Sequence, residues 1–424
     1  MPASLTPGAA ADAGAPPDAA VAATTRPRPA SPARLGSVLG LDDFERAARR
    51  HLPWSVFNYI AGAAETNRSF HANRAAYAAW DFVPRVLVDV SRRELGTSLF
   101  GRRCSVPFGI APMGLAALSA YRGDLVLARA AAREGVPMVM SGSSLIRLEE
   151  VIAVDPDAWF QAYLPGDDAA IVALLERVRA AGYRTVVVTL DTPVAANREN
   201  NVRAGFSIPV RPGPRLAWQG LTHPRWLFGT FLRTLALHGM PHFENSYAAR
   251  GVPILSPTVE RSFSDRGHLT WRHLRLVRER WPGHLVVKGV LDPRDARQAV
   301  AEGADGIVVS NHGGRQLDGA VAPLRALPGI VAACPGVPVM IDSGIRRGTD
   351  VLKALALGAR FVFVGRPFAF AAAVAGEAGA LHAIELLRAE VSRDMALLGV
   401  TALDQLDASR LVADTARPPT GDPT

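Results

Sequence analysis

A histidine, two glycines and an arginine, His312 to Arg315, come shortly after an apolar run, with Ser310 and Asn311 between them. The preceding run, 306–309, is continuous and largely β-branched, which predicts a buried strand. An imidazole can exchange a proton near neutral pH, glycines let the backbone approach a ligand, and a guanidinium fits a carboxylate. The pattern therefore favours a site that binds an anionic substrate and moves a proton. The alternative is a polar turn that only ends a core strand.

The elements that must position these residues form a regular series. Eight short apolar runs alternate with segments of helical periodicity: 108–113, 137–141, 159–163, 185–191, 284–289, 306–311, 338–343 and 361–365. Each run is largely continuous, as expected of parallel strands covered on both faces. We therefore predict an α/β fold, a (β/α)8 TIM barrel, with an N-terminal helical segment and a long insertion after strand four. The alternative, a doubly wound sheet, would require a Gly-x-Gly-x-x-Gly turn that the sequence lacks.

Polar or glycine-bearing segments stand at the end of every predicted strand. They contain Pro112, Met113 and Gly114, Ser141, Gln161 and Tyr163, Thr189 and Asp191, Lys288, Ser310 and His312, Asp342 and Gly344, and Gly365 and Arg366. In a barrel these ends meet at one face, where the loops build the active site. We expect these groups to surround one cavity.

The last two strand ends have the chemistry of a phosphate site. Gly344 precedes Arg346, and Gly365 precedes Arg366, each in a turn that leads into a helix. Backbone N–H groups, a helix N-terminus and a guanidinium together bind phosphate, and barrels commonly do so at strands seven and eight. The alternative is that both arginines are surface residues that cap turns.

Lys288 lies inside an apolar run, where a lysine is costly to bury without an anionic partner. A reduced flavin supplies that partner, because negative charge develops on its pyrimidine ring. A Schiff-base lysine of an aldolase is the rival interpretation. Gln161, Thr189 and Ser141 are neutral hydrogen-bonding residues suited to the edge of a flavin, although each is individually more typical of a satisfied core group.

His312 has candidate partners for acid–base chemistry. Asp191 ends strand four, and an aspartate beside a histidine orients the ring and stabilises its protonated form. Arg198 and Arg315 could hold a substrate carboxylate from two sides. Tyr59 and Tyr163 could add hydroxyl donors, with an ordinary packed aromatic as the alternative for Tyr59.

These residues resemble those of the FMN-dependent α-hydroxy-acid oxidase and dehydrogenase family, which includes glycolate oxidase, lactate dehydrogenases and mandelate dehydrogenase. The similarity runs from about Leu41 to Asp414, and its most specific segments are 310–318, 342–350 and 351–367. It implies that FMN is the cofactor and that an (S)-2-hydroxy acid is oxidised to a 2-oxo acid. His312 would accept the hydroxyl proton while hydride passes to flavin N5; a carbanion route with the same base is also open.

The resemblance also implies roles for the other residues. Asp191 would be the partner of the catalytic base, Arg198, Arg315 and Tyr59 would hold the substrate carboxylate, and Tyr163 would lie near the substrate hydroxyl. Lys288 would lie beside flavin N1 and O2. Pro112, Met113, Gly114, Ser141, Gln161, Thr189 and Ser310 would contact the isoalloxazine and ribityl groups, and Asp342, Gly344, Arg346, Gly365 and Arg366 the ribityl and phosphate groups. The electron acceptor would be oxygen, a quinone or another carrier.

Two departures from the family pattern are informative. Gly114 stands where glycolate oxidases carry alanine, so we expect a substrate bulkier than glycolate, with an aryl or branched side chain. The segment 59–64 differs from the usual aromatic pair and glycine pattern, which makes the position of Tyr59 less certain than that of His312. Rival functions are another FMN barrel enzyme, an isomerase or a reductase, and a non-catalytic flavin-binding protein.

Composition limits the other classes. The chain has 424 residues and a net charge of +8, with arginines scattered rather than gathered in a stripe, so no nucleic acid is expected. Cys104 and Cys334 have no metal-ligand spacing and favour a reducing compartment. No metal site and no secretory signal are predicted, and no uncharged apolar run reaches membrane-span length. We expect a cytoplasmic protein, or one peripheral to the inner face of the membrane.

Domain organisation follows from the same sequence. Residues 1–36 are rich in alanine and proline and are predicted to be a disordered tail, 37–415 the barrel domain, and 416–424 a flexible tail. Within the barrel, the insertion 205–270 contains apolar residues around Trp226 together with Arg225 and Arg233. It could form an interfacial helix on an anionic membrane. A lid or a subunit contact is the interpretation that we favour, and we expect a homo-oligomer, a tetramer or an octamer.

Overall fold

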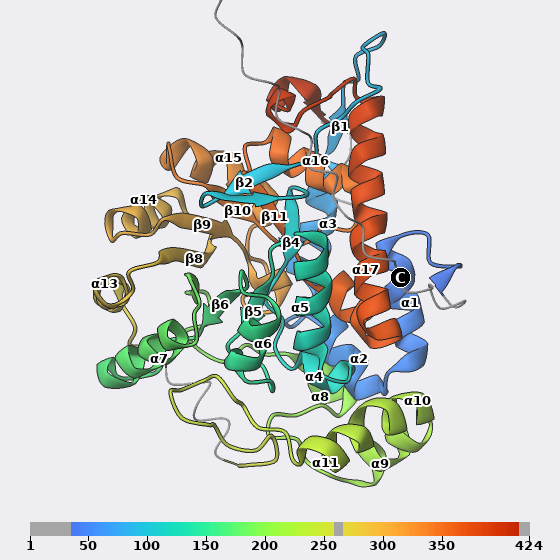
Figure 1. Cartoon of the computed structure of the whole chain (residues 1–424), viewed down its shortest axis with the longest axis vertical. Helices are drawn as coiled ribbons and strands as arrows, with labels where there is room; N and C mark the ends of the chain where they lie inside the picture. The colour runs from blue at the N-terminus through green and yellow to red at the C-terminus, as the bar shows by residue number, and fades with distance from the viewer. Residues whose placement is uncertain (1–34, 258–265, 415–424) are drawn as a thin grey trace, which may run out of the picture. The chain divides into compact units, whose positions relative to one another are not determined.

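Eight parallel strands form the centre of the structure, a computed structural model that describes residues 35–257 and 266–414. They are β4 (Phe108–Ile110), β5 (Val139–Ser141), β6 (Trp159–Ala162), β7 (Thr185–Thr189), β8 (His284–Val290), β9 (Gly306–Val309), β10 (Val339–Ile341) and β11 (Phe361–Val364). Their order is β4-β11-β10-β9-β8-β7-β6-β5. A parallel bridge between Ile110 and Met138 joins the two remaining edges. The predicted eight-stranded barrel is confirmed (Figure 1).

Most strands end earlier than their apolar runs suggest. The run 108–113, for example, leaves the ladder after Ile110, and 185–191 leaves it after Thr189. Ala111 and Leu190 each donate one further backbone hydrogen bond to the neighbouring strand, and the chain beyond them turns into loops at the carboxyl face of the barrel. Some of the predicted polar residues, such as Gln161 and Thr189, are in the last part of a strand, and others, such as Asp191 and His312, are in the loop that follows it.

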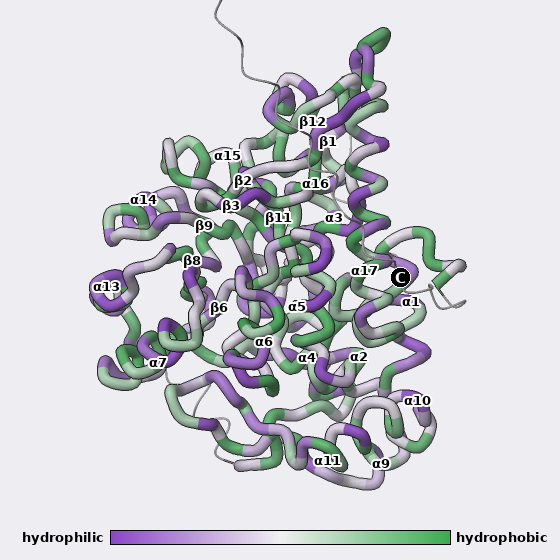
Figure 2. Tube along the Cα trace, in the orientation of Figure 1, coloured by the Kyte–Doolittle hydropathy of each residue, from purple (hydrophilic) through white to green (hydrophobic). Residues whose placement is uncertain are grey.

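Helices follow the strands and bury apolar residues against the barrel. They are α4 (Ala116–Ser119), α5 (Gly123–Glu134), α6 (Leu148–Val154), α7 (Asp168–Ala180), α13 (Trp271–Arg280), α14 (Pro293–Ala301), α15 (Pro323–Ala333), α16 (Gly348–Ala356) and α17 (Arg366–Leu397). In α7 the buried residues Ile171, Leu174, Leu175 and Val178 recur at three or four positions. Figure 2 shows hydrophobic and hydrophilic residues alternating along such helices.

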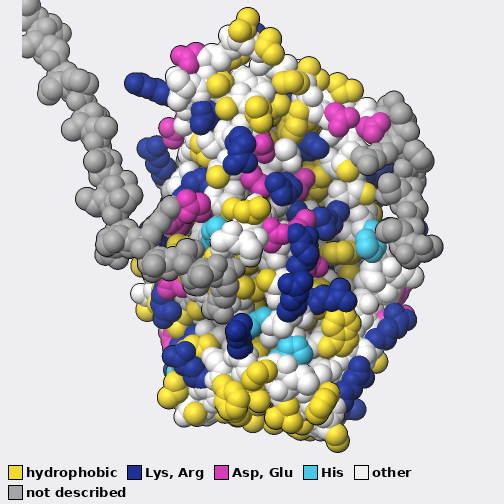
Figure 3. Space-filling view, turned by 90° about the vertical axis from the view of Figure 1, so that its right-hand side faces the viewer, with side chains coloured by type: hydrophobic (Ala, Val, Ile, Leu, Met, Phe, Trp, Pro, Cys, Tyr) yellow, Lys and Arg dark blue, Asp and Glu magenta, His cyan; other side chains and the backbone are white. Residues whose placement is uncertain are grey.

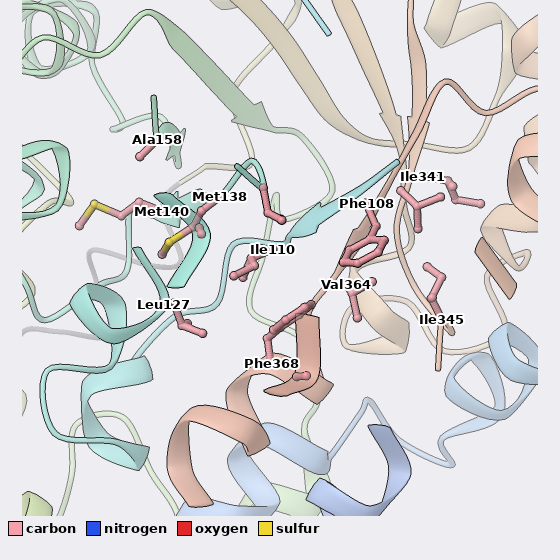
Figure 4. Close-up of a cluster of buried hydrophobic side chains, with 14 of the residues drawn as sticks. Phe108, Ile110, Leu127, Met138, Met140, Ala158, Ile341, Ile345, Val364 and Phe368 are labelled. Atoms are coloured by element: carbon pink, nitrogen blue, oxygen red, sulfur yellow. The ribbon is translucent and has the colours of Figure 1, made fainter. Parts of the chain in front are cut away.

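Two layers of apolar side chains stabilise the barrel. Trp159, Val286 and Phe363 belong to the cluster inside it. The hairpin of β2 (Thr97–Leu99) and β3 (Arg102–Cys104) adds Leu99 and Cys104 to that cluster. A second layer lies between the strands and the helices; Figure 4 shows Phe108 and Val364 from neighbouring strands beside Phe368 of α17.

The N-terminal helical segment consists of α1 (Leu41–His51), α2 (Trp54–Ala61) and α3 (Arg68–Ala78). Asp43 stabilises the start of α1, because its carboxylate accepts hydrogen bonds from the N–H groups of Leu39 and Gly40. β1 (Trp80–Phe82) then pairs antiparallel with β12 (Leu411–Ala413) near the other end of the described chain. Leu35, which we assigned to the N-terminal tail, is buried in the core. The predicted tails otherwise lie outside the described residues, apart from Gly36.

The long insertion lies between β7 and β8, as predicted. α8 (Glu199–Ala204) comes just before it, and the insertion itself contains α9 (Pro214–Leu221), α10 (Pro224–Trp226), a π-helical turn η2 (Leu227–Leu232) and α11 (Arg233–His238). The Trp226 indole N–H donates to the Leu118 carbonyl at 2.7 Å, and the Ser55 N–H donates to the Gln219 side-chain carbonyl at 2.9 Å. These bonds fasten the insertion to α4 and α2 of the barrel domain (Figure 1).

Short 3₁₀ turns complete the described structure, η3 (His312–Gly314), η4 (Leu403–Gln405) and η5 (Ala408–Arg410). The longest helix, α17, is long and apolar enough to cross a membrane by those two criteria alone. Its buried residues, among them Phe368, Ile384 and Leu387, nevertheless pack in the protein core. We therefore describe α17 as a core helix.

Candidate active site

A cavity of about 660 Å³ opens at the carboxyl ends of the barrel strands. Its volume is in the range typical of cofactor and ligand sites. Most residues that we predicted to act together line it: Tyr59, Pro112, Met113, Gly114, Gln161, Tyr163, Thr189, Arg198, Lys288, His312, Arg315, Asp342, Gly365 and Arg366. The structure thus brings residues from α2 and from the ends of all eight strands to one cavity, and the end of β5 contributes Ser143 in place of the predicted Ser141.

His312 and Asp191 form a hydrogen-bonded pair at this cavity. The imidazole Nδ1 lies 2.9 Å from a carboxylate oxygen of Asp191, while Nε2 lies 3.5 Å from the Tyr163 hydroxyl. Burial lowers the pKa of His312 below its ordinary value, although Asp191 acts in the opposite direction. Burial acts to raise the pKa of Asp191, but His312 and Lys288 lower it overall. The pair therefore has a charged carboxylate beside an imidazole that is neutral near pH 7, the arrangement of a general base.

Local backbone features bring this pair together. Gly289 adopts a φ of +101° at an irregularity in the pairing of β8 and β9, and a Cβ at this position would lie 2.6 Å from the Cβ of Asp191. Glycine is therefore required to leave room for the aspartate. His312 itself has a φ of +59°, which is uncommon outside glycine and marks a position held by its surroundings. Asn311 and Asn73 exchange two side-chain hydrogen bonds, of 2.7 and 2.8 Å, that hold this loop.

Two arginines approach the same side of the cavity. Arg198 donates to the Arg315 carbonyl at 3.2 Å and to the Gln316 side-chain carbonyl at 2.9 Å. Arg315 donates to the Gly62 carbonyl at 2.8 Å, and its guanidinium lies 5.2 Å from the ring centre of Tyr59. Burial, together with the charge of Arg198, lowers the pKa of Arg315 to about 10, so the group is still charged at neutral pH. Two guanidinium groups in one wall suit a carboxylate ligand.

Lys288 is buried beside an acidic partner. Its ammonium lies 3.1 Å from a carboxylate oxygen of Asp342 and donates to the Ser310 hydroxyl at 2.8 Å. Burial disfavours the charged ammonium, but Asp342 and Asp191 raise the pKa of Lys288 above its ordinary value. The lysine is therefore a fixed positive charge in the cavity wall. A charged lysine is suited to stabilise an anionic ring and unsuited to Schiff-base chemistry, which needs a neutral amine.

Polar atoms without partners test whether a flavin fits. The Gln161 side-chain carbonyl accepts hydrogen bonds from the Ser141 hydroxyl at 3.1 Å and from the Gly142 N–H at 3.3 Å. Its amide nitrogen and the Thr189 hydroxyl are buried, and neither has a hydrogen-bond partner in the protein. Because unsatisfied buried polar groups are costly, these atoms are suited to bind the heteroatoms of a ligand such as the flavin pyrimidine ring.

The end of β11 provides an anion site. Arg366 begins α17, and its guanidinium donates to the carbonyls of Ile60, Gly62 and Gly313 at 2.9–3.0 Å. Burial, together with neighbouring Arg315, lowers the pKa of Arg366 well below its ordinary value. A phosphate at this helix N-terminus would supply the missing negative charge. The residues present therefore fit both the ring and the phosphate of FMN.

Five predicted residues do not line the cavity. Asp191, Ser141 and Ser310 lie behind it and hold residues that do, while Gly344 packs against the backbone of Asn73. The placement of Arg346 differs from our expectation, because its side chain is directed to Asp42 at 3.1 Å and Glu45 at 3.8 Å, both on α1. Two acidic residues far away in the sequence compete for this arginine, which its glycine-rich motif could not reveal.

Sequence reasoning missed several residues of the site. Gln316 accepts a hydrogen bond from Arg198 and donates one to the backbone carbonyl of Asp191 at 3.2 Å. It therefore connects Arg198 to the hydrogen-bonded pair of His312 and Asp191. Arg266 and Phe206, both from the insertion, line the cavity. Gln316 follows Arg315 directly in the sequence and was within reach of the motif. The other two carry no local signal.

The barrel, its buried lysine, two buried donors without a partner and the anion site at the last strand together fit an FMN-binding (β/α)8 oxidoreductase. The comparisons agree with this class. The FMN-dependent dehydrogenase family matches residues 48–413. The chain belongs to that family, and its cofactor is FMN, which confirms the resemblance seen in the sequence.

Particular relatives are informative about the branch of the family. An L-lactate dehydrogenase of Ectopseudomonas mendocina is 40% identical over 383 residues, covering 88% of this chain and 98% of the relative. An (S)-mandelate dehydrogenase of Pseudomonas putida is 38% identical over 376 residues, covering 88% and 94%. The crystal structure of the monotopic membrane protein (S)-mandelate dehydrogenase matches with a TM-score of 0.82 and 37% identity, covering 89% of this chain and all 100% of that chain.

Proposed function

We propose that this enzyme oxidises (S)-2-hydroxy acids with side chains larger than that of glycolate to the corresponding 2-oxo acids. The observation that carries the proposal is the His312–Asp191 pair, 2.9 Å apart, beside two guanidinium groups in one cavity wall. A base next to a carboxylate clamp is what removal of a proton from a 2-hydroxy acid requires.

Each residue has a defined part in the reaction. Arg198 and Arg315 bind the substrate carboxylate and thereby fix the α-carbon. His312 Nε2 accepts the proton of the substrate hydroxyl, and the Asp191 carboxylate stabilises the imidazolium that results. FMN, when bound, accepts the hydride equivalent from the α-carbon. Loss of one proton and one hydride converts the C–O single bond into the carbonyl of the product.

The protonation states support this assignment. Because burial lowers the pKa of His312, the imidazole is in its proton-accepting form near neutral pH. Lys288 keeps its positive charge despite its burial, because the carboxylates of Asp342 and Asp191 stabilise the ammonium. A fixed positive charge at this position would stabilise negative charge on a flavin ring bound in the cavity.

The cavity offers room for a large substrate side chain. A methyl group at Gly114 would lie 3.1 Å from the Tyr59 hydroxyl and 3.2 Å from Ser143 Cβ, so the glycine keeps this space open. Phe206 and Phe243 add apolar walls. An aryl or branched side chain would gain from burial there, whereas the hydrogen of glycolate would not.

Comparison of kcat/KM for glycolate, (S)-lactate and (S)-mandelate tests the proposal. We expect mandelate to be the best of the three and glycolate the poorest. Gly114→Ala should raise KM for mandelate more than KM for lactate, because the added methyl group crowds the cavity. A strong preference of the wild-type enzyme for glycolate would contradict the proposed substrate class.

We further propose that the insertion contacts an anionic membrane surface. Its outer face exposes apolar side chains, with Phe228 66% and Leu237 62% exposed, and carries Arg225 and Arg233 nearby. Exposed apolar residues beside cations are typical of an interfacial helix. Figure 3 shows hydrophobic side chains gathered at the lower end of one face, the end that holds α9 and α11 in Figure 1. A quinone in that membrane would be an accessible electron acceptor.

Sedimentation with anionic and with neutral vesicles tests the membrane contact. The wild-type protein should sediment with anionic vesicles, and a Phe228→Ser, Leu237→Ser variant should not. Leu397→Ser is the control, because Leu397 is equally exposed, at 69%, but lies at the end of α17. Equal sedimentation of all variants, or none for the wild type, would count against the contact. Admission of oxygen to the reduced enzyme, with peroxide detection, then separates an oxidase from a dehydrogenase.

A further inference from the structure

Arg266 lies at the point where the long insertion returns to the barrel, just before α13. Its side chain is buried, with the residue 8% exposed, and it lines the active-site cavity. The guanidinium carbon lies 4.6 Å from the ring centre of Tyr163. A cation at this distance over an aromatic face makes a cation–π interaction, which is strongest where water is excluded.

The tyrosine beneath this arginine contacts the catalytic base. The Tyr163 hydroxyl lies 3.5 Å from His312 Nε2, the nitrogen that accepts the substrate proton. A substrate hydroxyl that donates to this nitrogen must therefore lie close to the phenol as well. Arg266, the Tyr163 ring, the His312 imidazole and the Asp191 carboxylate form a continuous series of contacts.

We propose that Arg266 is a positioning residue that acts through Tyr163: its guanidinium holds the ring against the cavity wall and polarises the phenol, so that the hydroxyl is a better donor to the reacting substrate oxygen. This deepens the proposed function and rests on it. The insertion thus contributes to catalysis in addition to any surface role.

Other charges also act on Tyr163, and they define what Arg266 should and should not change. Burial raises the pKa of the Tyr163 hydroxyl, as does Asp191, while Lys288, Arg198 and Arg266 lower it. The charges with the largest effect on the pKa of His312 are those of Asp191, Lys288 and Arg198. Removal of Arg266 should therefore leave the acid limb of the pH–rate profile, which reports His312, in place.

A double-mutant cycle on the FMN-loaded enzyme tests the proposal. Arg266→Met should slow anaerobic flavin reduction by (S)-mandelate between about 2-fold and about 30-fold, the range from an exposed to a desolvated cation–π contact. In a Tyr163→Phe background the same change should have no further effect, because no hydroxyl is left to polarise. Arg266→Lys, which keeps the charge but not the planar group, should lose less and follow the same pattern.

Arg233→Met is the matched control, because Arg233 lies 3.9 Å over the ring of Tyr121 and neither residue lines the cavity. It should leave the reduction rate unchanged. If Arg266→Met does not retain FMN, the cycle is completed with Arg266→Lys. Equal loss in both tyrosine backgrounds, no loss at all, or a shifted acid limb would overturn the inference. Failure of the proposed function is distinct, since the wild-type flavin would then not be reduced by any 2-hydroxy acid.

Discussion

The Asp191–His312 pair gives a prediction whose size can be worked from the geometry. Asp191→Asn keeps the shape but removes the charge that stabilises the imidazolium. At 2.9 Å and an effective dielectric constant of about 20, the charge pair is worth about 6 kcal/mol. A neutral hydrogen bond retains about half of a charge-assisted one, so at least about 3 kcal/mol of transition-state stabilisation is lost, or about 10²-fold in rate.

The loss should be larger if the asparagine also changes the tautomer. Its amide can donate to Nδ1, which would leave the proton on Nε2 and block the base; this effect costs about 10⁴-fold in serine proteases. We therefore expect flavin reduction to slow by about 10²- to 10⁴-fold. The pH dependence should change too. The carboxylate raises the pKa of His312 against burial, so its removal lowers that pKa further and moves the acid limb to lower pH.

The assay is anaerobic stopped-flow reduction of bound flavin by (S)-mandelate. It is measured from about pH 5 to about pH 9, on both sides of the ordinary histidine pKa. Flavin content and the unfolding midpoint of the variant serve as controls for its integrity. A plateau rate within about tenfold of the wild type, or an acid limb that moves to higher pH, would refute the role assigned to Asp191.

Two further predictions concern residues that shape the site. Gly289→Ala and Gly182→Ala both place a side chain at a positive φ, +101° and +102°, so each variant should lose about 1–3 kcal/mol of unfolding free energy in urea titrations. Only Gly289→Ala should also slow flavin reduction. Its Cβ would meet Asp191, whereas a Cβ at Gly182 meets nothing within 4 Å. Lys288→Met leaves Asp342 buried without its partner, so it should lower the free energy of unfolding by about 3–5 kcal/mol and weaken FMN binding. Denaturant unfolding and flavin titration measure the two effects. Unchanged values for both would contradict the assignment of Lys288 and Asp342 as a charge pair.

The barrel could be predicted from the sequence because its strands are buried on both faces. A continuous run such as 185–189 has no amphipathic alternation and ends at a polar residue, so both the strand and its end are visible. Because the polar ends of these runs can be recognised in the sequence, most residues that line the cavity could be predicted as well. The exact point at which each strand leaves the ladder was less visible, since Pro112 and Met113 continue an apolar run after the pairing has ended.

Residues with long-range partners could not be predicted. The Asn73–Asn311 pair joins positions 238 residues apart, and neither amide has a local feature that distinguishes it. Arg346 has a motif that favours phosphate, and its ion pair with Asp42 of α1, far away in the sequence, could not be predicted from that motif. Arg266 lies in an insertion without periodicity, and only the path of the chain shows that it reaches Tyr163.

Anaerobic addition of the two enantiomers of mandelate to the FMN-loaded enzyme tests the central claim most directly. The base and the arginine pair fix one orientation of the α-hydrogen toward the flavin, so the (S) enantiomer should bleach the flavin absorbance and yield one equivalent of the 2-oxo acid, while the (R) enantiomer should not. If the flavin stays oxidised with (S)-mandelate and with other (S)-2-hydroxy acids, or if both enantiomers reduce it equally, the account of His312, Arg198 and Arg315 is contradicted.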